Sequence, residues 1–276
     1  MTEPFVRGRS PRPVRIAVQL HPQHAPYRLL RDAVRRAEAL GVDAVFTWDH
    51  FFPLYGPPTG QHFECWTTLA AWAEQTTTVH IGPMVSCVAF RNPHLLADMA
   101  RTVDHVSGGR LVLGLGAGWS EADFTGFGYP VKPAGELIDD LATALPVIRE
   151  RLHGPDRGPV GHVPVMIGGA GERKTLPLVA RHADIWHSFS VKDELVPRIT
   201  LLRGYCAEIG RDFDEIEVAV AVGGGGRDWR APGAPDRWGE PLRQAGASLF
   251  TLAVGGARYD LTEVQAWLDW RDRVSG

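Results

Sequence analysis

The hydrophobic positions of the first half alternate between short continuous runs and longer stretches with helical spacing. The run 14–20 is apolar and β-branched, which predicts a buried strand. In 25–41 the apolar residues recur every three or four positions before Gly41, which is typical of a helix that ends at a glycine cap. The same alternation predicts further strands over 43–50, 79–86 and 110–118, and helices over 64–76, from Pro93 onward, and over 134–152.

The second half repeats this rhythm. Continuous apolar runs predict strands over 163–169, 184–189, 215–222 and 248–254. The stretches between and after them predict helices over 172–183, near 192–209 and over 262–273, and a short helix after the loop 223–235. Runs without alternation are expected of parallel strands that are covered on both faces. Eight strand–helix units therefore favour a (β/α)8 TIM barrel. A doubly wound open sheet is the alternative, but the turn after the first strand, HPQHAP, lacks a GxGxxG pattern.

The domain organisation follows from the same pattern. Residues 14–276 form one predicted barrel domain, because no linker-like stretch interrupts the repeat. Residues 1–13 read as a flexible basic lead-in without the apolar segment of a secretory signal. Inside the predicted helix at 172–183, Pro177 removes a hydrogen-bond donor, so the first turn there is expected to be irregular.

Composition narrows the functional classes. The formal net charge of −3 gives no basic field for nucleic acid, and no apolar run is long enough to span a membrane. The three cysteines are far apart, so neither a disulfide framework nor a zinc knuckle is expected. A reducing, cytoplasmic location is the default. Several histidines are available, but HxH and HExxH patterns are absent, so no metal site is predicted.

In such barrels the active site lies at the carboxyl ends of the strands, and this rule selects candidates without a motif search. Asp49 and His50 follow the second strand. Adjacent residues at a strand end point to different sides, so the two are expected to do different jobs. A histidine titrates near neutral pH and can donate a proton or a hydrogen bond, whereas the structural alternative is a capping Asp and a packed His.

The other strand ends carry small and sulfur-containing residues. The stretch GLGAGW contains Gly116, Ala117, Gly118 and Trp119; its glycines either admit something flat against the strand or suit a crowded barrel interior. The turn GGAGERK contains Gly168, Gly169, Ala170 and Gly171, whose backbone N–H groups can approach an anion, with Arg173 and Lys174 adding charge. Ser86 and Cys87 follow the third strand, where a structural role is favoured over a reactive thiol, and His187 follows the sixth.

Three stretches together resemble the luciferase-like superfamily, and within it the oxidoreductases that use the deazaflavin coenzyme F420. They are GVDAVFTWDHF (41–51), RNPHLLADMARTVDHVSGGRLVLGLGAGWSEADFTGFGYP (91–130) and VPVMIGGAGERKTLPLVARHADIWH (163–187). The resemblance covers roughly 14–190, whereas the last third is generic. It implies a (β/α)8 barrel, in agreement with the strand count.

The resemblance also implies roles for the candidates. His50 would lie beside the deazaflavin ring as acid or hydrogen-bond donor, and Asp49 would support it or touch the polar edge of the ring. A non-proline cis peptide is expected near Ser86 and Cys87. Gly116 to Trp119 would pass close to the ring, Gly168 to Gly171 would hold the phosphate of the cofactor, and His187 joins the cofactor site.

Departures from the family pattern bear on the substrate. Trp119 stands where sugar-phosphate dehydrogenases of the family carry a catalytic Glu, which argues against sugar-phosphate oxidation. The segment before the fifth strand shrinks to 154–162, so the substrate pocket is expected to be open or reshaped.

The functional prediction is an F420-dependent oxidoreductase that transfers hydride between the cofactor and an unsaturated or electrophilic small molecule. An FMNH2-dependent monooxygenase of the same fold and a cofactor-binding protein without turnover are the alternatives. The expected partners are a small-molecule substrate and a second copy of the chain, because members of the superfamily commonly form homodimers.

Overall fold

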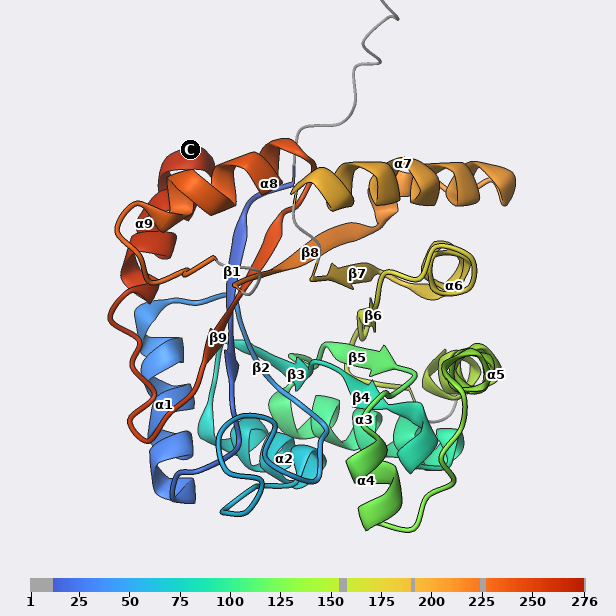
Figure 1. Ribbon diagram of the computed structural model, residues 1–276, viewed down its shortest axis with the longest axis horizontal. Coiled ribbons are helices and arrows are strands. Elements are labelled where there is room, and N and C mark those ends of the chain that lie inside the picture. Colours follow the sequence, from blue (N-terminus) through green and yellow to red (C-terminus); the bar gives the residue numbers. More distant parts are fainter. Residues whose placement is uncertain (1–11, 154–157, 190–191, 224–226, 276) are drawn as a thin grey trace, which may run out of the picture.

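The computed structural model describes residues 12–153, 158–189, 192–223 and 227–275 as a parallel barrel surrounded by helices (Figure 1). Most of the 1–13 lead-in and part of the 154–162 segment therefore lie outside the described residues. The strands are β1 (Arg15–Leu20), β2 (Ala44–Thr47), β3 (His80–Pro83), β4 (Ser86–Cys87), β5 (Leu113–Gly116), β6 (Val165–Gly168), β7 (Ile185–Ser188), β8 (Glu217–Val222) and β9 (Leu249–Val254).

All paired strands run parallel, in the order β3-β2-β1-β9-β8-β7-β6-β5-β4. The two ends of this order meet, because the Ile81 N–H donates to Arg110 O at 3.0 Å and the Val112 N–H donates to Ile81 O at 2.9 Å. The nearly closed parallel barrel confirms the fold class expected from the eight repeats. We call this meeting of β3 with the start of β5 the seam.

The helices form a ring outside the strands (Figure 1). They are α1 (Tyr27–Leu40), α2 (Cys65–Gln75), α3 (Pro93–Ser107), α4 (Glu121–Gly126), α5 (Ala134–His153), α6 (Thr175–His182), α7 (Lys192–Glu208), α8 (Glu240–Gln244) and α9 (Val264–Ser275). Short helical turns lie at η1 (Val88–Phe90), η2 (Phe213–Glu215) and η3 (Pro235–Gly239). In the described residues no helix is long and apolar enough to cross a bilayer.

Local signals explain where several helices begin and end. Gly41 caps α1 with φ +86°, where a side chain would be strained. Asn92 accepts the His94 N–H at 2.9 Å, and Pro93 opens α3 as expected. α6 begins at Thr175, three residues later than predicted. Pro177 therefore falls in the first turn, where its missing N–H has no helical partner to lose. The start of the helix is irregular, as expected, because the Leu176 N–H donates to Gly171 O, five residues back, at 3.0 Å.

Two features of the chain were not predicted from the hydrophobic periodicity. The third predicted strand is split into β3 and β4, and the break contains a cis peptide between Met84 and Val85. The short helix α4 fills the region after β5, where no helix was predicted. Both features lie at the carboxyl ends of strands, where local periodicity carries little information about the path of the chain.

Alternate residues of the strands build two apolar layers. Ile16, Val18 and Leu20 of β1 join the large cluster between strands and helices, whereas Ala17 joins a smaller cluster inside the barrel. The interior cluster takes its members from most strands: Ala17, Ala44, Phe46, Met84, Val112, Met166, Ile185, Ala219 and Leu249. These residues make the interior of the barrel a packed core, and the carboxyl ends of the strands lie above it.

The seam makes a strong prediction about Gly114. A Cβ at this residue would lie 2.1 Å from Pro83 O, a backbone atom that cannot rotate away. Gly114→Ala should therefore lower the free energy of unfolding by ~3 kcal/mol, near the upper end of overpacking costs. Urea unfolding followed by circular dichroism measures this change.

Gly204→Ala is the matched control. Gly204 lies in α7, and a Cβ there meets nothing within 4 Å. This substitution should raise the free energy of unfolding by about 0.5–1 kcal/mol, since alanine favours the helix. Equal effects of the two substitutions would contradict the close approach at the seam.

Candidate active site

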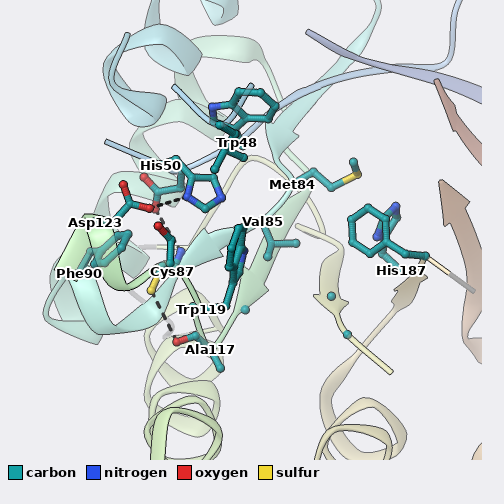
Figure 2. Close-up of a pocket in the computed structure, with 18 of the residues that line it drawn as sticks. Trp48, His50, Met84, Val85, Cys87, Phe90, Ala117, Trp119, Asp123 and His187 are labelled. Carbon is teal, nitrogen blue, oxygen red and sulfur yellow. Dashed lines mark hydrogen bonds and ion pairs between the residues drawn. The ribbon is translucent and has the colours of Figure 1, made fainter. Parts of the chain in front are cut away.

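A cavity of about 380 Å³ opens at the carboxyl ends of the strands (Figure 2). Most of the candidate residues lie around it: Asp49, His50, Cys87, Gly116, Ala117, Gly118, Trp119, Gly168, Gly169 and His187. Three candidates do not line it, namely Ser86, Ala170 and Gly171. The rule that places barrel sites at strand ends therefore brought together residues that are more than 130 positions apart in the chain.

His50 is held on one side of the cavity by a residue that the sequence did not single out. Its Nδ1 lies 2.5 Å from Asp123 Oδ2, and the Phe51 N–H donates to Asp123 Oδ1 at 2.8 Å (Figure 2). Asp123 comes from α4 and is 1% exposed, whereas the His50 side chain is 15% exposed. Burial alone would raise the pKa of Asp123, but these hydrogen bonds outweigh it and lower that pKa below its usual value.

The ionised Asp123 fixes the tautomer of His50. A carboxylate only accepts hydrogen bonds, so Nδ1 of His50 must carry the hydrogen that it shares with Asp123. The other ring nitrogen, Nε2, is then free to gain or lose a proton. This arrangement gives His50 one fixed and one reactive nitrogen, which is what a general acid or a polarising hydrogen-bond donor requires.

Asp49 has a different partner from the one expected. Both of its carboxylate oxygens bind Arg91, at 2.6 and 3.0 Å, and Oδ2 also accepts hydrogen bonds from Ser86 Oγ and the Cys87 N–H. Among the described residues it is Asp123, and not Asp49, that hydrogen-bonds to His50. Asp49 thus joins the end of β2 to β4 and to the segment before α3, and its oxygens are already occupied.

Ser86 and Cys87 belong to the same buried layer. The Ser86 hydroxyl donates to Asp49 and accepts the Trp66 Nε1–H at 3.0 Å. Burial raises the pKa of the Cys87 thiol to about 12, and its Sγ lies 3.6 Å from Ala117 O. A thiol that stays protonated is a poor nucleophile. The structural role favoured by the sequence therefore agrees with these contacts.

The glycines at the ends of β5 and β6 leave space that the Val85 side chain fills. The cis peptide lies at Met84–Val85, just before the expected Ser86–Cys87 position, and Val85 reaches into the barrel mouth (Figure 2). A Cβ at Gly116 would lie 2.5 Å from Val85 Cγ2, and one at Gly168 would lie 3.0 Å from Val85 Cγ1. Of the two readings of GLGAGW, a crowded interior is therefore the one that the packing supports. Val85 forms the floor of the cavity.

The turn after β6 is a tight cradle beside the start of α6. Gly169 has φ +126°, and a Cβ at Gly171 would lie 2.8 Å from the Thr175 hydroxyl oxygen. Thr175, the first residue of α6, is buried and lines the cavity. Lys174 points its ammonium at Asp139, at 2.7 Å, rather than into the turn. The backbone and Thr175 are thus the groups here that can meet an anion.

His187 lies across the cavity from His50 (Figure 2). It is 1% exposed, and burial lowers its pKa to about 4, so the ring is neutral at pH 7. Its Nε2 has no hydrogen-bond partner in the described structure. A buried polar atom without a partner is uncommon, so this nitrogen is a ready contact for a polar group of a bound molecule.

The described residues contain no cluster of His, Cys, Asp and Glu side chains that could hold a metal ion. His50 and Asp123 are a paired acid and base at the wall of the cavity, where a bound organic molecule can meet them. Loss of the His50 imidazole would remove an acid–base group that lines the cavity and is already paired with a carboxylate.

This chain belongs to the luciferase-like monooxygenase family, whose model matches residues 12–223. It is 32% identical over 176 residues to an F420-dependent glucose-6-phosphate dehydrogenase of Intrasporangium calvum, covering 56% of this chain and 51% of that protein. It is 29% identical over 184 residues to a putative coenzyme F420-dependent oxidoreductase of Mycobacterium tuberculosis, covering 56% of this chain and 49% of that protein. The chain thus spans about half the length of these curated relatives.

Solved structures share the fold. An F420-dependent secondary alcohol dehydrogenase, in complex with an F420–acetone adduct, superposes with a TM-score of 0.80 at 18% identity, over 94% of this chain and 98% of that one. A coenzyme F420 dependent tetrahydromethanopterin reductase from Methanopyrus kandleri superposes with a TM-score of 0.73, also at 18% identity and over the same shares. At this identity the likeness concerns the fold alone.

Burial of His187 makes the stability of the protein depend on pH. Its pKa is about 4 in the folded chain and near 6.5 when it is exposed, so between these values only the unfolded chain binds the proton. The free energy of unfolding should fall as the pH drops through this window, by at most ~1.4 kcal/mol per pH unit for this group. Urea unfolding between about pH 7 and 4.5 measures the slope.

His187→Asn tests the assignment, since it removes one titrating ring from that slope. His21 and His62, whose pKa values burial also lowers to about 4, keep their contributions in the variant. The variant should show a shallower pH dependence than the natural protein. An unchanged slope would mean that His187 is not held neutral by burial.

Proposed function

We propose that this protein is an F420-dependent oxidoreductase that reduces an unsaturated or electrophilic small molecule. The observation that carries the proposal is the buried Asp123 carboxylate that orients His50 beside the cavity. The family membership and the F420-dependent relatives at about 30% identity support the choice of cofactor. The substrate class and the direction of hydride transfer are proposed here from the cavity and not from these relatives.

The residues around the cavity fit a molecule with a polar ring edge and an anionic tail. The unpartnered Nε2 of His187 can bind a polar edge, and the turn at Gly168 and Gly169 with Thr175 can bind a phosphate. Val85 and Met84 would support a flat ring from below, as lining residues of the cavity.

The reduced deazaflavin would supply the hydride, and the protein would supply orientation and the proton. His50 would donate the matching proton from Nε2 to the acceptor, so that one hydride and one proton add across its double bond. Asp123 would stabilise the imidazolium form of His50 before the transfer and keep Nδ1 protonated afterwards. Asp49 and Arg91 would hold the floor segment, and they would take no part in proton transfer.

Titration of the protein with F420 and with FMN, followed by cofactor fluorescence, tests the proposal. F420 should bind with a dissociation constant of about 1 μM and FMN at least about tenfold more weakly. The reverse preference, together with oxygen uptake in the presence of FMNH2, would select the flavin-dependent monooxygenase instead. If neither bound, the phosphate role of the 168–171 turn and the proposal itself would both fail.

His50→Ala should abolish most of the turnover while cofactor affinity stays within about twofold, because the imidazole contributes acid–base chemistry worth about 10²–10⁴ in rate. Single-turnover oxidation of the reduced cofactor measures the rate, and the fluorescence titration measures the affinity. Unchanged turnover would remove His50 from the mechanism.

Asp123→Asn tests whether the negative charge of Asp123 acts on His50, or whether its side chain has only a structural role. The amide keeps an oxygen for the Phe51 N–H but cannot stabilise a charged imidazole. The rate should fall and its dependence on pH should move to lower values, since the protonated His50 loses its anionic partner. A lower rate with an unmoved pH profile would assign Asp123 a purely structural role.

Two expectations about the whole protein stay predictions. A homodimer is proposed because members of the superfamily commonly form homodimers. The molar mass of the purified chain in sedimentation equilibrium tests it. A cytoplasmic location is proposed from the cysteine usage and tested by fractionation of cells.

A further inference from the structure

Three large aromatic side chains stand exposed around the mouth of the cavity. Tyr55 is 61% exposed, Trp119 is 72% exposed and Phe189 is 69% exposed, and all three line the cavity. They come from separate segments, the loop after β2, the loop after β5 and the end of β7. Exposed apolar groups that converge on one opening mark a binding surface, since scattered exposure would need no explanation.

These rings are positioned by their neighbours. The backbone oxygen of Tyr55 accepts a hydrogen bond from Gln23 Nε2 at 2.8 Å, and its ring stacks on His21 at 5.3 Å. Trp119 and Phe189 each meet a cavity histidine edge-on, with ring centroids 5.4 and 5.0 Å apart. A binding surface that is already ordered loses little conformational freedom when a ligand binds.

The carboxylates at the cavity already have partners within the protein. Asp49 is bound by Arg91, and Asp123 by His50 and the Phe51 N–H. None of the described residues that line the cavity is a lysine or an arginine. A carboxylate or phosphate bound between the aromatic rings and His50 would lose its hydration without gaining a cationic partner, which is unfavourable.

We propose that the cavity selects an uncharged, largely apolar substrate with a planar part that packs against Tyr55, Trp119 and Phe189 and reaches His50. This inference rests on the proposed function, because it names the substrate class of that same site. Trp119 is the main specificity determinant, since it contacts His50 and is the most exposed of the three rings.

The inference separates this chain from its named relatives. The relatives that are 32% and 33% identical to it carry the name F420-dependent glucose-6-phosphate dehydrogenase. A substrate with a phosphate group needs a cation or several N–H donors where that group lies, and the aromatic mouth offers neither among its described lining side chains. The expectation from Trp119 that sugar phosphates are not oxidised here has the same physical basis.

Isothermal titration of the full-length protein with three naphthalene probes tests the inference. The probes are 2-acetonaphthone, 2-naphthoate and the 2-naphthyltrimethylammonium ion, which share one ring system and differ in charge. The neutral probe should bind at least about tenfold more tightly than either charged probe. Trp119→Ala should weaken the neutral probe about tenfold through the lost ring contact.

Val131→Ala is the control, because Val131 is 55% exposed and does not line the cavity. It should leave the affinity for the neutral probe unchanged. Phe189→Ala provides a second variant, which should also weaken binding of that probe, so a folding defect in either single variant leaves the inference testable.

Every other outcome overturns the inference. Equal or tighter binding of the anionic probe would assign an acidic substrate, and tighter binding of the cationic probe would assign an aromatic cation site. Absence of binding of all three probes at millimolar concentration, or full affinity in both aromatic variants, would show that the rings do not form the substrate surface. These titrations use no cofactor, so failure of F420 binding is scored separately from the substrate class.

Discussion

The seam between β3 and β5 is the constraint on which the cavity depends. Two backbones approach so closely there that a Cβ at Gly82 would lie 2.1 Å from Val112 O, and one at Gly114 equally close to Pro83 O. Below the seam, the buried guanidinium of Arg110 donates to four backbone oxygens and one hydroxyl, which joins the ends of α2 and α3 to β3. Closure at this point turns an open row of strands into a barrel with a mouth.

Above the seam the same closeness shapes the floor of the site. The chain leaves β3 after Pro83, and Val85 enters the space that glycines of β5 and β6 leave open. Asp49 holds the next segment, because it binds Ser86, the Cys87 N–H and Arg91 at once. Loss of Arg91 would leave that carboxylate buried and uncompensated, which costs far more than a surface ion pair contributes. The floor is therefore fixed before any ligand binds.

The sequence predicted the barrel because its signals are local. Each of these signals depends only on neighbouring residues: the continuous apolar runs, the glycine after α1 and the Asn92–Pro93 pair. Eight strand–helix units in a row are then compatible with few folds, of which the closed barrel is the simplest. Most of the candidate residues reached one cavity for the same reason, since strand ends share an edge. The role of Asp123 was not predicted, because it depends on a contact with His50, 73 positions away. The local pattern of the sequence carries no information about such a contact. Of the two roles expected of Asp49, direct support of His50 is not seen, because its carboxylate binds Arg91, 42 positions away.

Asp49 and Asp123 have different partners, and this difference explains how one site combines a rigid floor with a reactive group. Asp49 is bound through both oxygens by a permanent cation, so its contacts are those of a support for the floor. Asp123 is bound by an imidazole, whose charge changes with one proton, so its pair alternates between a net negative and a balanced state. A neutral molecule beside the apolar mouth adds no further charge to this pair. Departure of the proton then leaves the negative charge on Asp123, where the hydrogen bond from the Phe51 N–H persists to hold it.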